Sequence, residues 1–177
     1  MSQSIHSTTK RNIFWFRRDL RLADNPALLA AIENSEELIA VYILDEKIIK
    51  DSGSKRLAYL GQSLRALDES LNNKLHVISG DNIEVLHSLI KRYGADEVHI
   101  SQEYEPYGAD RDLKVEASGI KLIRTGSIYA VAPGRVLKPS DETPYRVYTP
   151  FYKAWCLHGW RKPVPAPKNL NLVTPTA

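Results

Sequence analysis

Five short apolar runs alternate along the chain with segments that have helical periodicity. The runs cover residues 13–16, 38–44, 75–78, 97–100 and 121–123. The first three are almost continuously apolar, which is typical of strands buried on both faces of a parallel sheet. The sequence therefore predicts five strands at these positions.

Four helices are predicted between these strands. Asn25 and Pro26 begin the first, because Asn is a good N-cap and Pro at the first helical position loses no hydrogen bond. The second is the clearest, because its leucines are three or four residues apart and share one face. Asp81 and Glu84 form a capping-box pattern that begins the third, and a weaker pattern over residues 107–118 predicts the fourth. The leucines of the second helix are Leu57, Leu60, Leu64, Leu67 and Leu71.

Alternating strands and helices indicate βαβ units with right-handed crossovers. We predict an α/β fold: a doubly wound, Rossmann-like, five-stranded parallel sheet with helices on both faces. In such sheets, ligands bind beyond the carboxyl ends of the strands, near the switch in strand order. The loops that follow the strands are therefore the place to look for a site.

The composition divides the chain into four parts. Residues 1–12 are polar and predict a disordered lead-in to the α/β domain of residues 13–130. Residues 131–161 contain several prolines and are expected to pack back on the domain as an exit segment. Residues 162–177 form a Pro-rich C-terminal extension, which is typical of a linker toward a further domain.

The overall composition is that of an ordinary soluble domain. Hydrophobic residues make up 43% of the 177 positions and charged residues 25%, while the net charge of +3 is too small to indicate nucleic-acid binding by itself. The single cysteine, Cys156, excludes a disulfide framework and a cysteine-based zinc site, and it fits a reducing, cytoplasmic location. The N-terminus is unlike a secretory signal, and no apolar run reaches the ~20 residues that span a membrane.

The common nucleotide and catalytic motifs are absent from the sequence. It contains neither the glycine-rich dinucleotide fingerprint nor a phosphate-binding P-loop, and no G-x-S-x-G motif marks a nucleophile. No cluster of His, Asp and Glu has the spacing of a metal site, and His87 and His99 are expected to have no ligand role. We therefore predict no metal and no catalytic residue in this chain.

Charged side chains follow the predicted strands instead. Because the carboxyl ends of parallel strands meet at one edge, these side chains should form a cleft that suits a planar heteroaromatic ligand. The alternative is an ion-pair network that joins the loops, for example Arg18 with Asp19 or Asp45, and the residue types alone favour this alternative. The residues concerned are Arg18, Asp45, Arg56, Glu103 and Glu105.

Several segments resemble the first part of DNA photolyases and cryptochromes. They cover residues 14–28, 42–45, 56–60, 105–112 and 144–155, in the order found in that family. The first, which begins Phe-Trp-Phe-Arg-Arg-Asp-Leu-Arg-Leu, is too long and specific for a chance match.

The resemblance implies a two-domain protein of which this chain is the first, light-harvesting domain. The second domain of such proteins is helical, binds FAD and damaged DNA, and performs the electron transfer. The whole protein would be a deoxyribodipyrimidine photolyase that repairs cyclobutane pyrimidine dimers with blue light and reduced FAD. This chain alone is expected to be inactive, to have the FAD-binding domain as its partner, and to reach DNA only through the full-length protein.

The resemblance also implies where an antenna pigment would bind. Folate-binding members of the family use an Asn-Glu pair just after the fourth strand, where this chain has Tyr107 and Gly108, which cannot supply those hydrogen bonds. A pigment of deazaflavin or flavin type is therefore expected rather than folate. The positions that match the binding site for such a pigment are Arg18, Tyr42, Leu44, Asp45, Arg56, Glu103 and Glu105.

Two other functions stay open at this point. A cryptochrome photoreceptor has the same architecture, and this domain alone does not separate it from a photolyase. A free-standing nucleotide-binding module would need a phosphate-binding loop, for which residues 79–81 are the one candidate. We also expect Tyr148, Phe151 and Trp155 to be exposed in this chain, which favours self-association.

Overall fold

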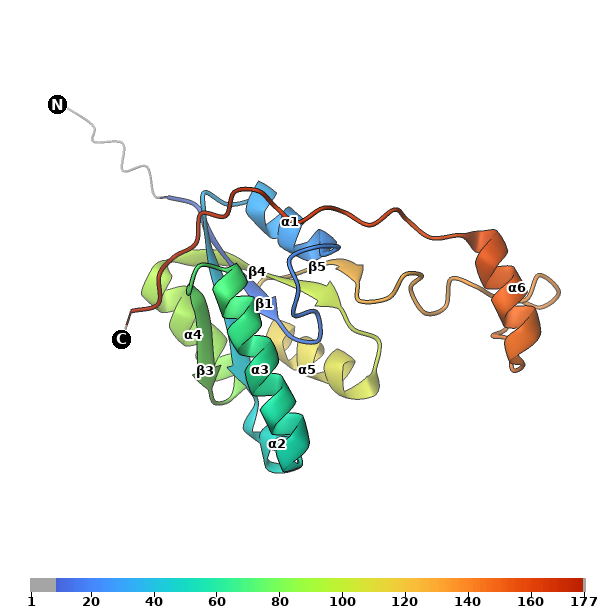
Figure 1. The fold of residues 1–177 in the computed structure, drawn as a ribbon, viewed down its shortest axis with the longest axis horizontal. Coiled ribbons are helices and arrows are strands. Elements are labelled where there is room, and N and C mark those ends of the chain that lie inside the picture. The colour runs from blue at the N-terminus through green and yellow to red at the C-terminus, as the bar shows by residue number, and fades with distance from the viewer. Residues whose placement is uncertain (1–8, 177) are drawn as a thin grey trace.

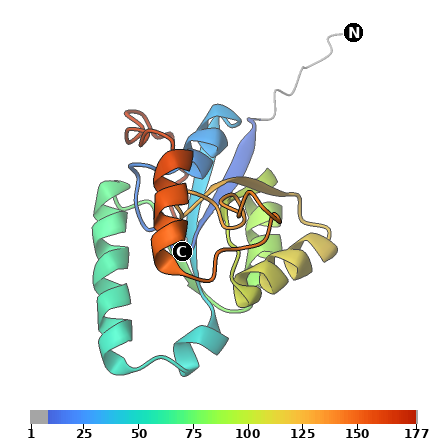
Figure 2. The same cartoon turned by 90° about the vertical axis from the view of Figure 1, so that its right-hand side faces the viewer.

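The computed structural model describes residues 9–176, and its centre is a sheet of five parallel strands (Figures 1 and 2). The strand order is β3-β2-β1-β4-β5, so the predicted parallel α/β fold is confirmed. Residues 11 and 12 belong to the first strand rather than to the expected lead-in, and residues 1–8 lie outside the described part of the chain. The strands are β1 (Arg11–Phe16), β2 (Glu37–Leu44), β3 (Leu75–Ser79), β4 (Ala95–Gln102) and β5 (Leu122–Ser127).

Six helices accompany the sheet in the described residues. Asn25 caps the first by accepting a hydrogen bond from the Leu28 amide at 3.1 Å, and Asp81 caps α4 by accepting from the Ile83 amide at 2.9 Å, as the sequence predicts. Of residues 9–176, no helix is long and apolar enough to cross a membrane. The helices are α1 (Pro26–Glu33), α2 (Glu46–Lys50), α3 (Ser54–Ser70), α4 (Asn82–Tyr93), α5 (Pro106–Ala117) and α6 (Tyr148–His158).

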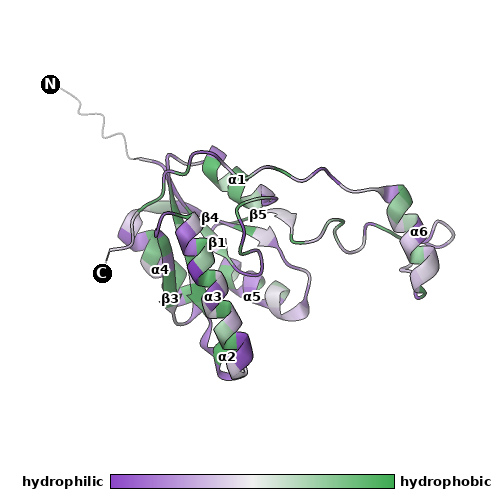
Figure 3. Ribbon diagram, viewed as in Figure 1, coloured by the Kyte–Doolittle hydropathy of each residue, from purple (hydrophilic) through white to green (hydrophobic). Residues whose placement is uncertain are grey.

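The central strands β1, β2 and β4 are mostly buried, and alternate residues of β1 contribute to two separate cores. Ile13 and Trp15 belong to the core between the sheet and helices α4 and α5. Phe14 and Phe16 belong to the core between the sheet and helices α1 and α3. Figure 3 shows green, hydrophobic segments within the sheet and helices in which hydrophobic and hydrophilic segments alternate. The period of two along a strand thus explains why the run is apolar at every position.

The C-terminal region departs from the sequence-based prediction. Every residue of α6 is at least partly exposed, and the helix lies well away from the sheet (Figure 1), so this part of the expected exit segment does not pack on the sheet. Arg161, at the end of the segment, does contact the domain through an ion pair with Asp24 at 2.5 Å. The expected exposure of Tyr148 and Phe151 is confirmed, at 73% and 37%, whereas Trp155 is half-buried. Phe151 and Trp155 line a separate groove together with residues 129–134 and Val136, and their rings contact Tyr145 and Trp160, respectively.

The last residues, by contrast, return to the domain. Val164 accepts a hydrogen bond from the Asp24 amide at 2.8 Å, and Leu172 pairs with Leu38 at the start of β2. Leu172 is only 5% exposed, because its apolar side chain joins the core on the α1 and α3 side. Residues 171–173 are therefore fixed against the sheet and do not behave as a free linker.

Candidate functional site

A cavity of about 530 Å³ opens at the carboxyl ends of β1, β2 and β4, between helices α2 and α3 on one side and α5 on the other. This volume lies in the range typical of small-molecule sites. The cavity is also next to the switch point of the sheet, because the chain continues from β1 to β2 on one side and returns to β4 on the other. Six of the seven predicted residues line it, namely Arg18, Tyr42, Asp45, Arg56, Glu103 and Glu105.

The seventh predicted residue, Leu44, is not among the residues that line the cavity. Its side chain packs against the core between the sheet and helices α1 and α3. The alternation of side chains along β2 places Tyr42 on this same face, but Tyr42 also reaches the cavity wall.

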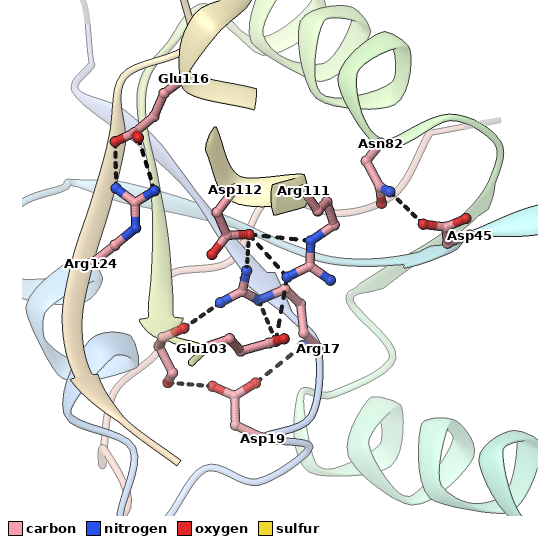
Figure 4. A network of polar contacts seen from close by, with 10 residues as sticks. Arg17, Asp19, Asp45, Asn82, Glu103, Arg111, Asp112, Glu116 and Arg124 are labelled. Carbon is pink, nitrogen blue, oxygen red and sulfur yellow. Dashed lines mark hydrogen bonds and ion pairs between the residues drawn. The ribbon is translucent and has the colours of Figure 1, made fainter. Parts of the chain in front are cut away.

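A buried ion-pair network lies behind the cavity (Figure 4), and its central residue is Arg17 rather than Arg18. The Arg17 guanidinium donates to Asp112 at 2.6 Å and lies 3.2 Å from a Glu103 oxygen. Arg111 lies 3.0 Å from Asp112 and 3.4 Å from the same Glu103 oxygen. Both guanidiniums stack on the ring of Trp15, at 5.2 and 4.8 Å from its centroid. Two cations thus balance two anions in a site from which water is largely excluded.

The same network fixes the loop between β1 and α1. Asp19 accepts hydrogen bonds from the Ser101 hydroxyl at 2.6 Å and from the Arg17 amide at 3.1 Å, while the Arg17 guanidinium donates to the Ser101 carbonyl. Burial and the nearby charge of Arg111 lower the pKa of Arg17, whereas Asp112 and Glu103 oppose that shift. The loop is therefore held on β4, and the following residue, Arg18, is directed toward the cavity.

Arg18 forms an ion pair with Glu105 at 2.5 Å at the rim of the cavity, where both side chains are about half exposed. The hydrogen bond from Arg18 lowers the pKa of Glu105. The predicted ion-pair network therefore exists, but the partners suggested for Arg18, Asp19 and Asp45, are wrong. The residue types alone present a ligand cleft and an ion-pair network as alternatives, but the structure contains both. The network lies beneath the cavity and supports its wall.

Asp45 joins three elements at the other end of the cavity. Its carboxylate accepts from the Tyr107 hydroxyl at 2.6 Å, from the Asn82 amide at 2.7 Å and, as the cap of α2, from the Lys47 amide at 3.0 Å. Burial opposes ionisation of Asp45, but these hydrogen bonds outweigh it and lower its pKa. Burial and the bond to Asp45 raise the pKa of Tyr107 to about 12. At neutral pH, Tyr107 is therefore a neutral donor and Asp45 a charged acceptor.

We expect the substitution Tyr107→Phe to raise the pKa of Asp45 toward its ordinary value, because the strongest donor to the carboxylate is lost. A carboxyl group whose pKa is lowered by folding stabilises the folded state above about pH 4, its pKa in the unfolded chain. This contribution to the free energy of unfolding is lost as the pH falls through the pKa of the group in the folded state. The wild-type chain should therefore lose more stability on acidification than the variant. Titration of the Asp45 carboxyl carbon by NMR measures the shift, and an unchanged Asp45 pKa in the variant would contradict this assignment.

Tyr59, Tyr107 and Arg111 also line the cavity, although the sequence does not single them out as ligand-binding residues. Arg111 follows Gly108 by three residues on α5, so the helical period places both on the face toward the strand ends. That spacing is the one signal in the sequence by which Arg111 could have been found. His99 lies outside the cavity, buried in β4 at 3.2 Å from Glu97.

Comparison with known proteins shows the family of the chain. Residues 12–168 match the family model described as DNA photolyase. The chain belongs to the DNA photolyase family. It is 35% identical over 92% of its length to a deoxyribodipyrimidine photo-lyase of Synechococcus sp., and 33% identical over 80% of its length to Cryptochrome-2 of Gallus gallus.

Solved structures of photolyases have the same fold. A class III photolyase of Agrobacterium tumefaciens matches 98% of the chain with a TM-score of 0.81 and 35% identity. An archaeal photolyase of Sulfolobus tokodaii, described with two FAD molecules and a novel light-harvesting cofactor, matches 92% with a TM-score of 0.77 and 25% identity. The chain spans 35% of the Synechococcus photolyase and 38% of each of these two structures, and it corresponds to the N-terminal domain of the family.

Proposed function

We propose that this chain is the light-harvesting domain of a deoxyribodipyrimidine photolyase and that its cavity holds an antenna pigment of flavin or deazaflavin type. The observation that carries the proposal is the cavity itself, in which aromatic rings and charged hydrogen-bonding groups meet at the strand ends. A bound pigment of this type would absorb blue light and pass the excitation on to the FAD of the photolyase.

The lining residues fit such a pigment. Tyr42 and Tyr59 offer flat faces for stacking, while Arg18, Arg56 and Asp45 offer donors and acceptors for the polar edge of a heteroaromatic ring system. The two positions that correspond to the folate-binding pair offer little by comparison. The Tyr107 hydroxyl already donates to Asp45, and Gly108 has no side chain. The description of the Sulfolobus photolyase, with its second FAD, supports a flavin at a light-harvesting site in this family.

The proposal extends to the whole protein. Residues 11–130 form the antenna domain, and a helical domain beyond this chain binds FAD and DNA and splits cyclobutane pyrimidine dimers with blue light. The chain alone has no repair activity, and the protein is cytoplasmic.

A cryptochrome is the second candidate, because Cryptochrome-2 of Gallus gallus is also a relative. Loss of pyrimidine dimers under blue light with the full-length protein supports the photolyase, and its absence supports the cryptochrome.

The pigment proposal is tested by mixing the chain separately with a deazaflavin, FMN, FAD and folate, followed by gel filtration and absorption spectroscopy. We expect a flavin or deazaflavin to elute with the protein. The substitution Arg56→Ala should weaken its binding by at least about tenfold, because a charge-assisted hydrogen bond is lost. Arg65→Ala is the matched control, since Arg65 belongs to the same helix but does not line the cavity.

Retention of folate alone would contradict the pigment assignment. ATP is added as a fifth ligand, and its retention alone would instead favour the nucleotide-binding module. The structure gives that module little support, because Asp81 in its candidate loop already caps α4 through its side chain.

A further inference from the structure

A second groove continues from the antenna cavity. It has a volume of about 490 Å³ and runs between the β1–α1 loop and the second half of α3, two segments that lie side by side in Figure 2. Arg18, Leu20, Tyr59 and Ser63 line both the cavity and the groove. A ligand that fills the cavity can therefore extend into the groove without leaving the protein surface.

The two spaces differ in charge. The cavity is lined by three arginines and three carboxylates, whereas the described residues that line the groove include three arginines and no carboxylate. The guanidinium of Arg17 belongs to the buried network, so the available cations of the groove are Arg18 and Arg21, with side chains 49% and 40% exposed. Arg18 is shared with the cavity, where it pairs with Glu105, so Arg21 is the cation that the groove adds to a cavity whose own charges balance.

Both arginines keep donors for an incoming anion. Arg18 uses one terminal nitrogen for Glu105. Arg21 uses one for the Asp24 carbonyl at 3.0 Å, and the Asp24 carboxylate lies 3.9 Å from the same nitrogen, while each guanidinium carries five N–H donors. The Ser63 hydroxyl donates to the Tyr59 carbonyl at 3.0 Å, so it contributes less. Recognition in the groove therefore rests on two planar guanidiniums, the groups that bind phosphate with two parallel hydrogen bonds.

We propose that this groove binds the phosphoryl group of the antenna pigment. The ring system lies in the cavity, and the phosphorylated tail follows the groove past Tyr59 toward Arg21. This inference rests on the proposed function and narrows it, because it selects a phosphorylated flavin or deazaflavin over the same ring system without phosphate.

The test compares the dissociation constants of FMN and riboflavin, which differ only in the phosphate. For the wild-type chain we expect FMN to bind at least about tenfold more tightly than riboflavin. Arg21→Ala should reduce this ratio at least about threefold, since Arg18 remains, and should leave the affinity for riboflavin unchanged, and Arg21→Gln should do the same. Arg65→Ala, which removes a cation from α3 outside both spaces, should preserve the ratio. Salt should weaken the binding of FMN but not that of riboflavin.

The outcomes separate this inference from the proposed function. Equal affinities for FMN and riboflavin in the wild type, or an undiminished ratio in Arg21→Ala and Arg21→Gln, would overturn the phosphate groove and leave the antenna cavity standing. If neither flavin nor deazaflavin binds the wild-type chain, both proposals fail together.

Discussion

Replacing Gly108 by alanine is expected to destabilise the chain by about 3 kcal/mol, although alanine is the better helix former. Gly108 lies in the first turn of α5, and a Cβ atom there would overlap a Glu103 carboxylate oxygen and lie 3.0 Å from the Glu103 Cβ. The carboxylate has little room to move, because its other oxygen lies against Arg17 and Arg111. The added methyl group must therefore displace either the helix or a buried ion pair.

Gly61→Ala in α3 is the matched control. The nearest atom to the methyl group that this substitution adds is the flexible end of Arg65 at 3.7 Å, an ordinary van der Waals contact. This variant should gain about 0.5–1 kcal/mol from helix propensity alone. Chemical unfolding of both variants gives the comparison. A Gly108→Ala protein as stable as the wild type would show that Glu103 is not held against α5. We also expect Gly108→Ala to weaken pigment binding and Gly61→Ala to leave it unchanged.

Replacing Arg17 by methionine is expected to cost about 3–5 kcal/mol, because it leaves two buried carboxylates with one guanidinium between them. The side chains of Arg17, Glu103 and Asp112 are 4%, 6% and 2% exposed, so water cannot replace the lost partner. In a chain of this length such a loss lowers Tm by about 10 °C. The second substitution Asp112→Leu, added to Arg17→Met, should recover part of the loss by removing one uncompensated charge.

The adjacent arginine supplies the control for this prediction. Arg18→Met removes the same charge from the same loop, but Arg18 and its partner Glu105 are about half exposed, so we expect no measurable change in Tm. Thermal unfolding followed by circular dichroism distinguishes the two positions. Equal effects of Arg17→Met and Arg18→Met would contradict the view that the network is a buried, structural support for the cavity.

Much of the fold follows from hydrophobic periodicity, and the exceptions have physical causes. Helix α3 is predictable because its leucines form one face, from which Leu64 and Leu67 enter the core. Helix α2 escapes prediction because five residues are too few for a periodic pattern. Helix α6 escapes prediction because it has no buried face, so its sequence carries no amphipathic signal.

The sequence predicts the place of the candidate site better than its details. Topology brings the residues after parallel strands together, which explains why six of the seven predicted positions line one cavity. The residue types alone do not show that Arg17 is buried and Arg18 exposed. The alternation of side chains along β1, continued past its end to residues 17 and 18, does predict this difference. Trp15 and Arg17 share the face toward α5, where both Arg17 and Arg111 stack on the Trp15 ring. The burial of Trp15 in the core is thus also what positions the network.

The most direct measurement is a crystal structure of the chain with the pigment that co-elutes with it. We predict electron density for a planar ring system in the cavity between α3 and α5, in contact with Tyr42 and Arg56, and for a phosphate beside Arg21. Density for the pigment elsewhere, for example against the aromatic side chains of α6, would contradict the proposal that the cavity at the strand ends is the antenna site.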